Sequence, residues 1–246
     1  MYFDIGANSI QLITKVYKKI KFYNTRNEDL NYATTKINLY NENELRERIY
    51  DIEGKTYNLV GNDVIEAKLQ KDQIFESDLD KYYKQVVFTQ PQIDKGSIVE
   101  VSYRTVSPIF WDIDEFEFQF DIPAKKVTAE IRTPNYFEFN QIPKGSILPN
   151  YEYAEERDFR IDGKVDIYNY SAEDVPPLKD EKYVGNINNY KSGILFELVS
   201  ITYKNGNVKK YAKSWNDVAT TIAFSDDYKS DIKRKGPYKE DIDAIT

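Results

Sequence analysis

Hydrophobic and polar residues alternate with a period of two through much of this chain. In residues 11–22 mostly apolar side chains occupy every second position, with a glutamine and several lysines largely between them. The same alternation runs through residues 99–105 and 127–132, and Phe137 and Phe139 continue it. A period of two separates the side chains onto the two faces of a strand. The pattern therefore predicts strands with one face on a core and the other in water, which is common in antiparallel sheets.

Turn-forming residues separate several of these segments. Asp162-Gly163 and Asn205-Gly206 each lie between apolar runs, and both dipeptides tolerate the positive φ angles of a tight β-hairpin. Gly61-Asn62-Asp63 is expected to join the two strands on either side of it. The longest apolar run, residues 193–203, is expected to form a central strand buried on both faces.

Helical signals are confined to two places. Ser214 precedes Asp217 by three residues, which is a variant of the capping box. The apolar residues that follow recur at helical spacing: Trp215, Val218, Ala219 and Ile222. A second, short helical turn is expected at residues 72–75.

The segment after Phe224 is polar and has the composition of a linker. Many short strands with polar turns and one terminal helix predict a mainly β fold, an antiparallel β-sandwich. We expect the sandwich domain at residues 1–212, with one or two sheet regions. Residues 213–246 are expected to form a helix and a linker toward a missing downstream domain.

Neither histidine nor cysteine occurs among the 246 residues. Without imidazole the chain lacks the side chain that most often transfers protons near pH 7. Without a thiol it has no thiolate nucleophile, no disulfide and no sulfur ligand for a metal. Ser–His–Asp and Cys–His catalysis are therefore excluded. We expect no enzymatic activity and no cofactor, with carboxylate chemistry or an oxygen-ligated metal as the remaining alternatives.

The charge balance narrows the classes of partner. The formal net charge of −7 argues against nucleic acid and anionic membrane as primary partners, because both need a basic face. No stretch approaches the roughly 20 apolar residues of a membrane span. The few glycines form no phosphate-binding loop.

The densest acidic stretch, residues 111–121, mixes carboxylates with phenylalanines. Such a cluster could bind calcium, which takes roughly six to eight oxygen ligands. The spacing lacks the Asp-x-Asp-x-Asp-Gly pattern, however, and Glu115 and Glu117 fit the solvated face of a strand better. Carboxylate-only catalysis needs two acids about 5–10 Å apart in a cleft, and nothing marks such a pair among the 41 acidic residues.

Exposed aromatic residues are the remaining candidates for ligand binding. We assign Phe110, Trp111 and Trp215 to a ligand or interface site, with core packing as the alternative role for such rings. For Trp215 in particular we favour a packing anchor on the predicted helix. Further rings that could stack on a sugar or clasp a peptide lie at residues 82–83, 151 and 153.

Seven segments, in order along nearly the whole chain, together resemble one family: the domain of unknown function that precedes transglutaminase-like domains in large exported bacterial proteins. Each segment alone is unspecific, and their ordered combination carries the resemblance. They are Lys-Ile-Lys-Phe-Tyr-Asn at 19–24, Lys-Thr-Tyr-Asn-Leu at 55–59, Phe-Thr-Gln-Pro at 88–91, Lys-Gly-Ser-Ile-Val-Glu-Val-Ser-Tyr at 95–103, Phe-Gln-Phe-Asp-Ile-Pro at 118–123, Asp-Val-Pro-Pro-Leu-Lys-Asp-Glu at 174–181 and Ser-Trp-Asn-Asp-Val-Ala at 214–219.

The resemblance implies an immunoglobulin-like β-sandwich in the periplasm or at the cell surface. It also implies that a downstream transglutaminase-like domain of the same polypeptide carries any catalytic triad, so no catalytic, cofactor-binding or metal residue is assigned here. The expected function is a non-catalytic accessory domain that packs against that neighbour or presents substrate to it. The alternative is an extracellular glycan- or peptide-binding module that uses exposed aromatics, and a carboxylate-only enzyme is the third reading.

Overall fold

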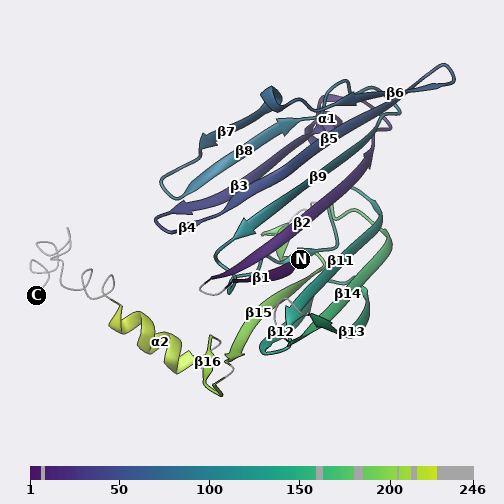
Figure 1. Cartoon of the computed structure of the whole chain (residues 1–246). Helices are drawn as coiled ribbons and strands as arrows, with labels where there is room; N and C mark the ends of the chain where they lie inside the picture. The colour runs from purple at the N-terminus through teal and green to yellow at the C-terminus, as the bar shows by residue number, and fades with distance from the viewer. Residues whose placement is uncertain (7–8, 159–162, 180–184, 204, 212–214, 226–246) are drawn as a thin grey trace, which may run out of the picture.

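The computed structural model of the chain describes residues 1–6, 9–158, 163–179, 185–203, 205–211 and 215–225. Its strands form three sheets (Figure 1). The largest has eight strands, which hydrogen-bond in the order β13 (Asn150–Asp158), β14 (Gly163–Val175), β11 (Ala124–Pro134), β1 (Tyr2–Ile5), β2 (Ile10–Lys21), β9 (Ile98–Ser107), β5 (Arg48–Val60) and β6 (Asp63–Lys68). Neighbouring strands in it are antiparallel except β1 and β11, which lie parallel where Tyr2 is opposite Arg132.

Two smaller antiparallel sheets complete the fold. One consists of β10 (Phe116–Glu117), β15 (Gly193–Thr202), β12 (Phe137–Lys144) and β16 (Val208–Lys210). The other consists of β4 (Leu45–Arg46), β3 (Thr34–Glu42), β8 (Tyr83–Thr89) and β7 (Ile74–Asp78). The helical elements are α1 (Asn27–Leu30), α2 (Trp215–Phe224) and 3-10 turns at Asn31–Ala33, Lys71–Gln73 and Ile187–Tyr190.

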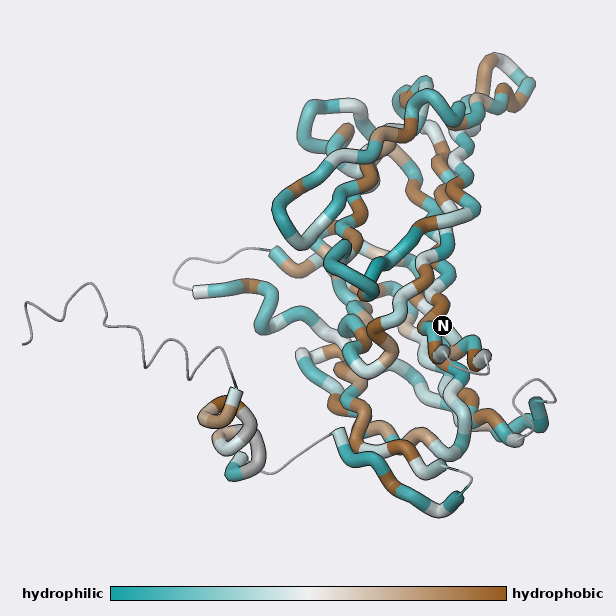
Figure 2. The backbone as a smooth tube through the Cα atoms, turned by 60° about the vertical axis from the view of Figure 1, so that its left-hand side comes forward, coloured by the Kyte–Doolittle hydropathy of each residue, from teal (hydrophilic) through white to brown (hydrophobic). Residues whose placement is uncertain are grey.

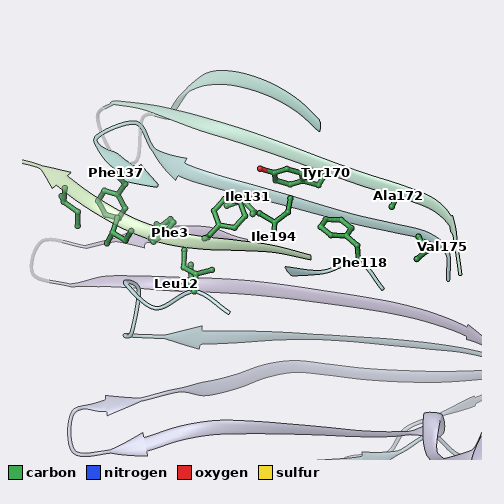
Figure 3. Packing of buried hydrophobic residues seen from close by; sticks show 13 residues of the cluster. Phe3, Leu12, Phe118, Ile131, Phe137, Tyr170, Ala172, Val175 and Ile194 are labelled. Carbon is green, nitrogen blue, oxygen red and sulfur yellow. The ribbon is translucent and has the colours of Figure 1, made fainter. Parts of the chain in front are cut away.

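The large sheet contributes to two separate hydrophobic cores. In the first core, which Figure 3 shows, side chains such as Phe3, Leu12 and Ile131 meet Ile194 of β15. In the second core, Val99 and Val101 of β9 are buried together with Phe88 of β8 and other residues of the smaller sheet. The two sandwiches therefore share one continuous sheet.

Alternation along β2 explains how one strand serves both cores. Leu12 lies in the first core and Ile20 packs against the second, and their even spacing puts both side chains on the same face of the strand. We call this the core face of the large sheet and the opposite side its outer face. Figure 2 shows the same alternation of hydropathy along the strands of the molecule.

The fold is mainly β, an antiparallel β-sandwich with one C-terminal helix, as the sequence predicts. All described strands lie within residues 1–212, the range predicted for the sandwich. The turns at Gly61-Asn62 and Asn205-Gly206 join β5 to β6 and β15 to β16. In both, the glycine adopts a positive φ, 64° for Gly61 and 81° for Gly206.

Two predictions lie partly outside the described residues. The first is the turn at Asp162-Gly163: Asp162 lies outside the described residues, although β13 and β14 on either side pair as expected of a hairpin. The second is the helix cap at Ser214, which lies outside the described residues, while the helix itself is confirmed as α2. No helix of the described part of the chain is long and apolar enough to cross a membrane.

Two local predictions are wrong. The helical turn expected at residues 72–75 is a 3-10 turn at Lys71–Gln73, and Ile74 already begins β7, where it pairs with Phe88. The run at residues 193–203 forms β15, which is central in its sheet but is not buried on both faces, since Leu195 is 42% exposed. This strand belongs to an outer layer, so only one of its faces has a sheet packed against it.

Candidate binding surfaces

The two aromatic residues at positions 110 and 111 have different surroundings. Phe110 packs against the first core, with its ring centroid 6.2 Å from that of Phe137 and 6.4 Å from that of Tyr211. Trp111 meets Phe110 edge to face at 5.1 Å and is 39% exposed. Phe110 is therefore a packing residue, and Trp111 presents part of its ring at the surface.

Trp215 is not brought near these residues to form a site. It begins α2, which stands away from the sheets in Figures 1 and 2, and it is 88% exposed. The expectation that it anchors the helix by packing is wrong for the described chain. An amphipathic helix needs a second surface to bury its apolar side, and the described residues do not supply one for Trp215.

Two carboxylates of the acidic stretch are paired with lysines. Glu115 lies 2.6 Å from Lys144, and Glu117 lies 3.1 Å from Lys191. Only residues 116–117 of the stretch form a strand, β10. Burial raises the pKa of Asp114, with smaller contributions from nearby carboxylates. The two lysines therefore occupy the carboxylates of Glu115 and Glu117.

Tyrosines gather on β13 and β14 at one edge of the large sheet. Tyr151 is opposite Tyr170, and Tyr153 is opposite Tyr168, with ring centroids 5.2 Å and 5.7 Å apart. Tyr151 and Tyr153 are each about half exposed. The Tyr153 hydroxyl donates to Asp166 at 2.7 Å, and this bond raises its pKa to about 12. We call Tyr151, Tyr153 and Tyr168 the tyrosine surface.

A cleft of about 510 Å³ opens on the outer face of the large sheet, where β2 begins and β9 ends. Its floor includes Ile13 and Val106, which are cross-strand neighbours. Three arginines line it: Arg46 of β4, Arg48 of β5 and Arg104 of β9. We call this site the arginine cleft.

Backbone pairing brings these arginines together. Arg48 is opposite Val106, and the next outward-facing position of β5, Tyr50, is opposite Arg104. Arg46 comes from β4, just before the chain enters β5. Nothing in the sequence signals this cluster, because Arg104 meets the other two only through long-range strand pairing.

A bulge in β5 places Asp51 where it holds Arg104, one of the three arginines of the cleft. Tyr50 is opposite Arg104 and Glu53 is opposite Ser102, so two residues of β5 face a single position of β9. Asp51, in this bulge, has a φ of 55°, an uncommon angle for a residue other than glycine. Its carboxylate accepts a hydrogen bond from Arg104 Nε at 2.8 Å, and the guanidinium lies 5.0 Å from the ring of Tyr50.

Arg46 and Arg48 are exposed and form no ion pair with the described residues. The acidic residues that line the cleft, Asp4 and Glu44, form none with them either. The cleft therefore holds two arginines without a charge partner beside a third that is held in place.

The sequence matches no family model and no curated protein. Among solved structures, the chain is similar to the crystal structure of a putative protease from Parabacteroides distasonis, with a TM-score of 0.59 and 16% identical residues. The match covers 81% of this chain and 39% of the Parabacteroides protein, so the chain spans well under half of that protein's length. At this identity the similarity shows a shared mainly β fold.

Proposed function

We propose that the chain is a non-catalytic accessory β-sandwich module of a longer, exported protein. In this proposal it packs against a downstream transglutaminase-like domain or presents substrate to it. The chemistry of the sequence supports this, because a chain without histidine and cysteine has neither of the usual nucleophile–base pairs. The chain is also similar in fold to a part of a longer protein, which is compatible with a module of a larger polypeptide.

The observation that carries the proposal is the exposure of α2. Trp215 is 88% exposed and Ile222 is 54% exposed on this helix. Exposed large apolar side chains on one short element are typical of surfaces that bind another protein surface. A further domain of the same polypeptide is the occupant we propose, because the match covers only 39% of the Parabacteroides protein.

The first test is the gene itself. We expect the reading frame to continue past Thr246 into a segment that contains cysteine and histidine at transglutaminase-like spacing. A stop codon directly after Thr246 would overturn the proposal. Purified chain should also show no peptidase or transglutaminase turnover, and turnover that disappears when one acidic side chain is neutralised would contradict a non-catalytic role.

The second test uses Trp215 as a reporter of docking. Trp111 and Trp215 are the two tryptophans of this chain, so the fluorescence of a Trp111→Phe variant minus that of a W111F/W215F variant isolates Trp215. We expect this difference spectrum to shift to shorter wavelength in the longer polypeptide than in the present chain, because docking removes the indole from water. An equal emission maximum in both would argue against docking through α2.

A glycan- or peptide-binding module is the second candidate, and the tyrosine surface favours it. Half-exposed tyrosine rings provide flat apolar area with a polar end, which suits stacking on sugars and peptides. Saturable binding of a glycan or peptide by the present chain, lost in Tyr151→Ala, would favour this candidate over docking alone. Tyr203→Ala is a suitable control, because Tyr203 is 43% exposed outside that surface.

A further inference from the structure

We propose that the arginine cleft binds the carboxylates of an acidic peptide that lies extended across the outer face of the large sheet. This inference goes beyond the accessory role, because it names a ligand class and a site that do not depend on a downstream domain. It stands on three features of the cleft: its unpaired arginines, the fixed position of Arg104 and its mixed lining.

Arginines outnumber acidic residues in the lining of the cleft, although acidic residues predominate in the whole chain. The chain has a formal net charge of −7, yet three arginines converge on this one cavity. Arg46 and Arg48 have no ion-pair partner in the described chain. Clustered like charges repel one another, so an anionic group that enters the cleft gains attraction and relieves that repulsion. Guanidinium groups match carboxylates through two parallel hydrogen bonds.

The cleft is organised before any ligand arrives. The guanidinium of Arg104 contacts both the carboxylate of Asp51 and the ring of Tyr50. The bulge that puts Asp51 in place requires a positive φ at a non-glycine residue, which is backbone strain of the kind that gathers at functional sites. Arg104 therefore needs little ordering on binding, and a side chain that is already fixed contributes more to affinity.

The lining favours a peptide over a phosphate or a sulfated glycan. Gln11 and Asn43 add side-chain amides that can donate to and accept from a peptide backbone. Val106, which is partly exposed, adds apolar area to the lining beside the buried Ile13. Asp4 and Glu44 also line the cleft, and their carboxylates would repel a densely charged polyanion. A peptide with spaced carboxylates can meet the arginines and avoid the two acids.

Fluorescence anisotropy with a labelled, terminally blocked peptide of alternating glutamate and glycine tests the proposal. The matched probe has glutamine in place of each glutamate. We expect saturable binding of the glutamate peptide that weakens with added salt, and at least tenfold weaker binding of the glutamine peptide. Arg48→Gln and Arg46→Gln should each weaken binding of the glutamate peptide by about tenfold.

Lys36→Gln is the control variant, because it removes the same unit of charge from an exposed position of β3 outside the cleft. It should leave the affinity unchanged. Arg46 and Arg48 are exposed, so all three variants should keep the wild-type far-UV circular dichroism and unfolding midpoint.

Three results would overturn the inference. Equal binding of the two peptides would show that carboxylates are not recognised. Equal weakening by K36Q and R48Q would show that only overall charge matters. Displacement of the peptide by inorganic phosphate or a sulfated oligosaccharide at lower concentration than by unlabelled peptide would assign the cleft to that other class of ligand.

Discussion

Replacing Thr56 with valine should stabilise the protein. Thr56 is fully buried in β5, opposite Val99 of β9. Its hydroxyl has no hydrogen-bond partner among the described residues. A buried hydroxyl without a partner costs about 1–3 kcal/mol, and valine has nearly the same shape without that group. We therefore expect Thr56→Val to raise the free energy of unfolding by about 1.5 kcal/mol.

Urea denaturation followed by circular dichroism measures this change. With a slope of about 2.5 kcal/mol per molar urea, the midpoint should rise by roughly 0.6 M. Thr34→Val is the matched control, since the Thr34 hydroxyl shares a hydrogen bond of 2.8 Å with the Thr89 hydroxyl. That variant should leave the midpoint unchanged or lower it. A lower midpoint for T56V would refute the reasoning, because it would mean that the hydroxyl has a partner, such as a buried water.

Three further predictions concern stability. Phe118→Ala should lower the free energy of unfolding by about 3–5 kcal/mol in urea denaturation, because Phe118 is fully buried in the first core; a loss under 1 kcal/mol would contradict that packing. Hydrogen bonds from Lys19 and, to a smaller extent, from Tyr17 lower the pKa of Glu100 below its usual 4.5. The stability that these bonds add is therefore present above pH 4.5 and is lost as the pH falls through the lowered pKa. Glu100→Gln should therefore reduce the acid-induced drop in midpoint, and an unchanged drop would count against this network. Trp215→Ala should change the stability of the present chain by less than about 0.5 kcal/mol, because Trp215 is 88% exposed; a larger loss in thermal unfolding would mean that the side chain packs.

Local signals predict the strands of this fold well. The alternation at residues 12–22 and 99–105 corresponds to β2 and β9, and the glycine turn after β5 sets the pairing of Val60 with Asp63. These features depend on neighbouring residues alone, since strand periodicity and turn geometry are local properties. The helix α2 is predictable for the same reason.

The arrangement of the sheets depends on contacts between distant residues. Nothing near β1 indicates that it lies between β2 and β11, or that its contact with β11 is parallel. A period of two specifies which side chains face a core, but it does not specify which core. The sequence therefore predicts a sandwich, but it does not show that one sheet contributes to two hydrophobic cores.

The candidate sites divide in the same way. Aromatic side chains can be found by residue type, and Trp111 is indeed partly exposed, but residue type cannot tell it from Phe110, which packs inward. The arginine cleft needs the register of β5 against β9, and the bulge at Asp51 has no glycine to mark it. Its parts become neighbours only when the strands pair.

The short strand β1 has a consequence for how the large sheet holds together. It lies between β11 and β2 in the large sheet, yet it spans only Tyr2–Ile5 and aligns with β11 at one residue pair, whereas β2 and β9 align over ten. Backbone pairing with β11 is therefore slight, and the large sheet stays continuous at this point because Phe3 of β1 and Ile131 of β11 are buried together in the first core.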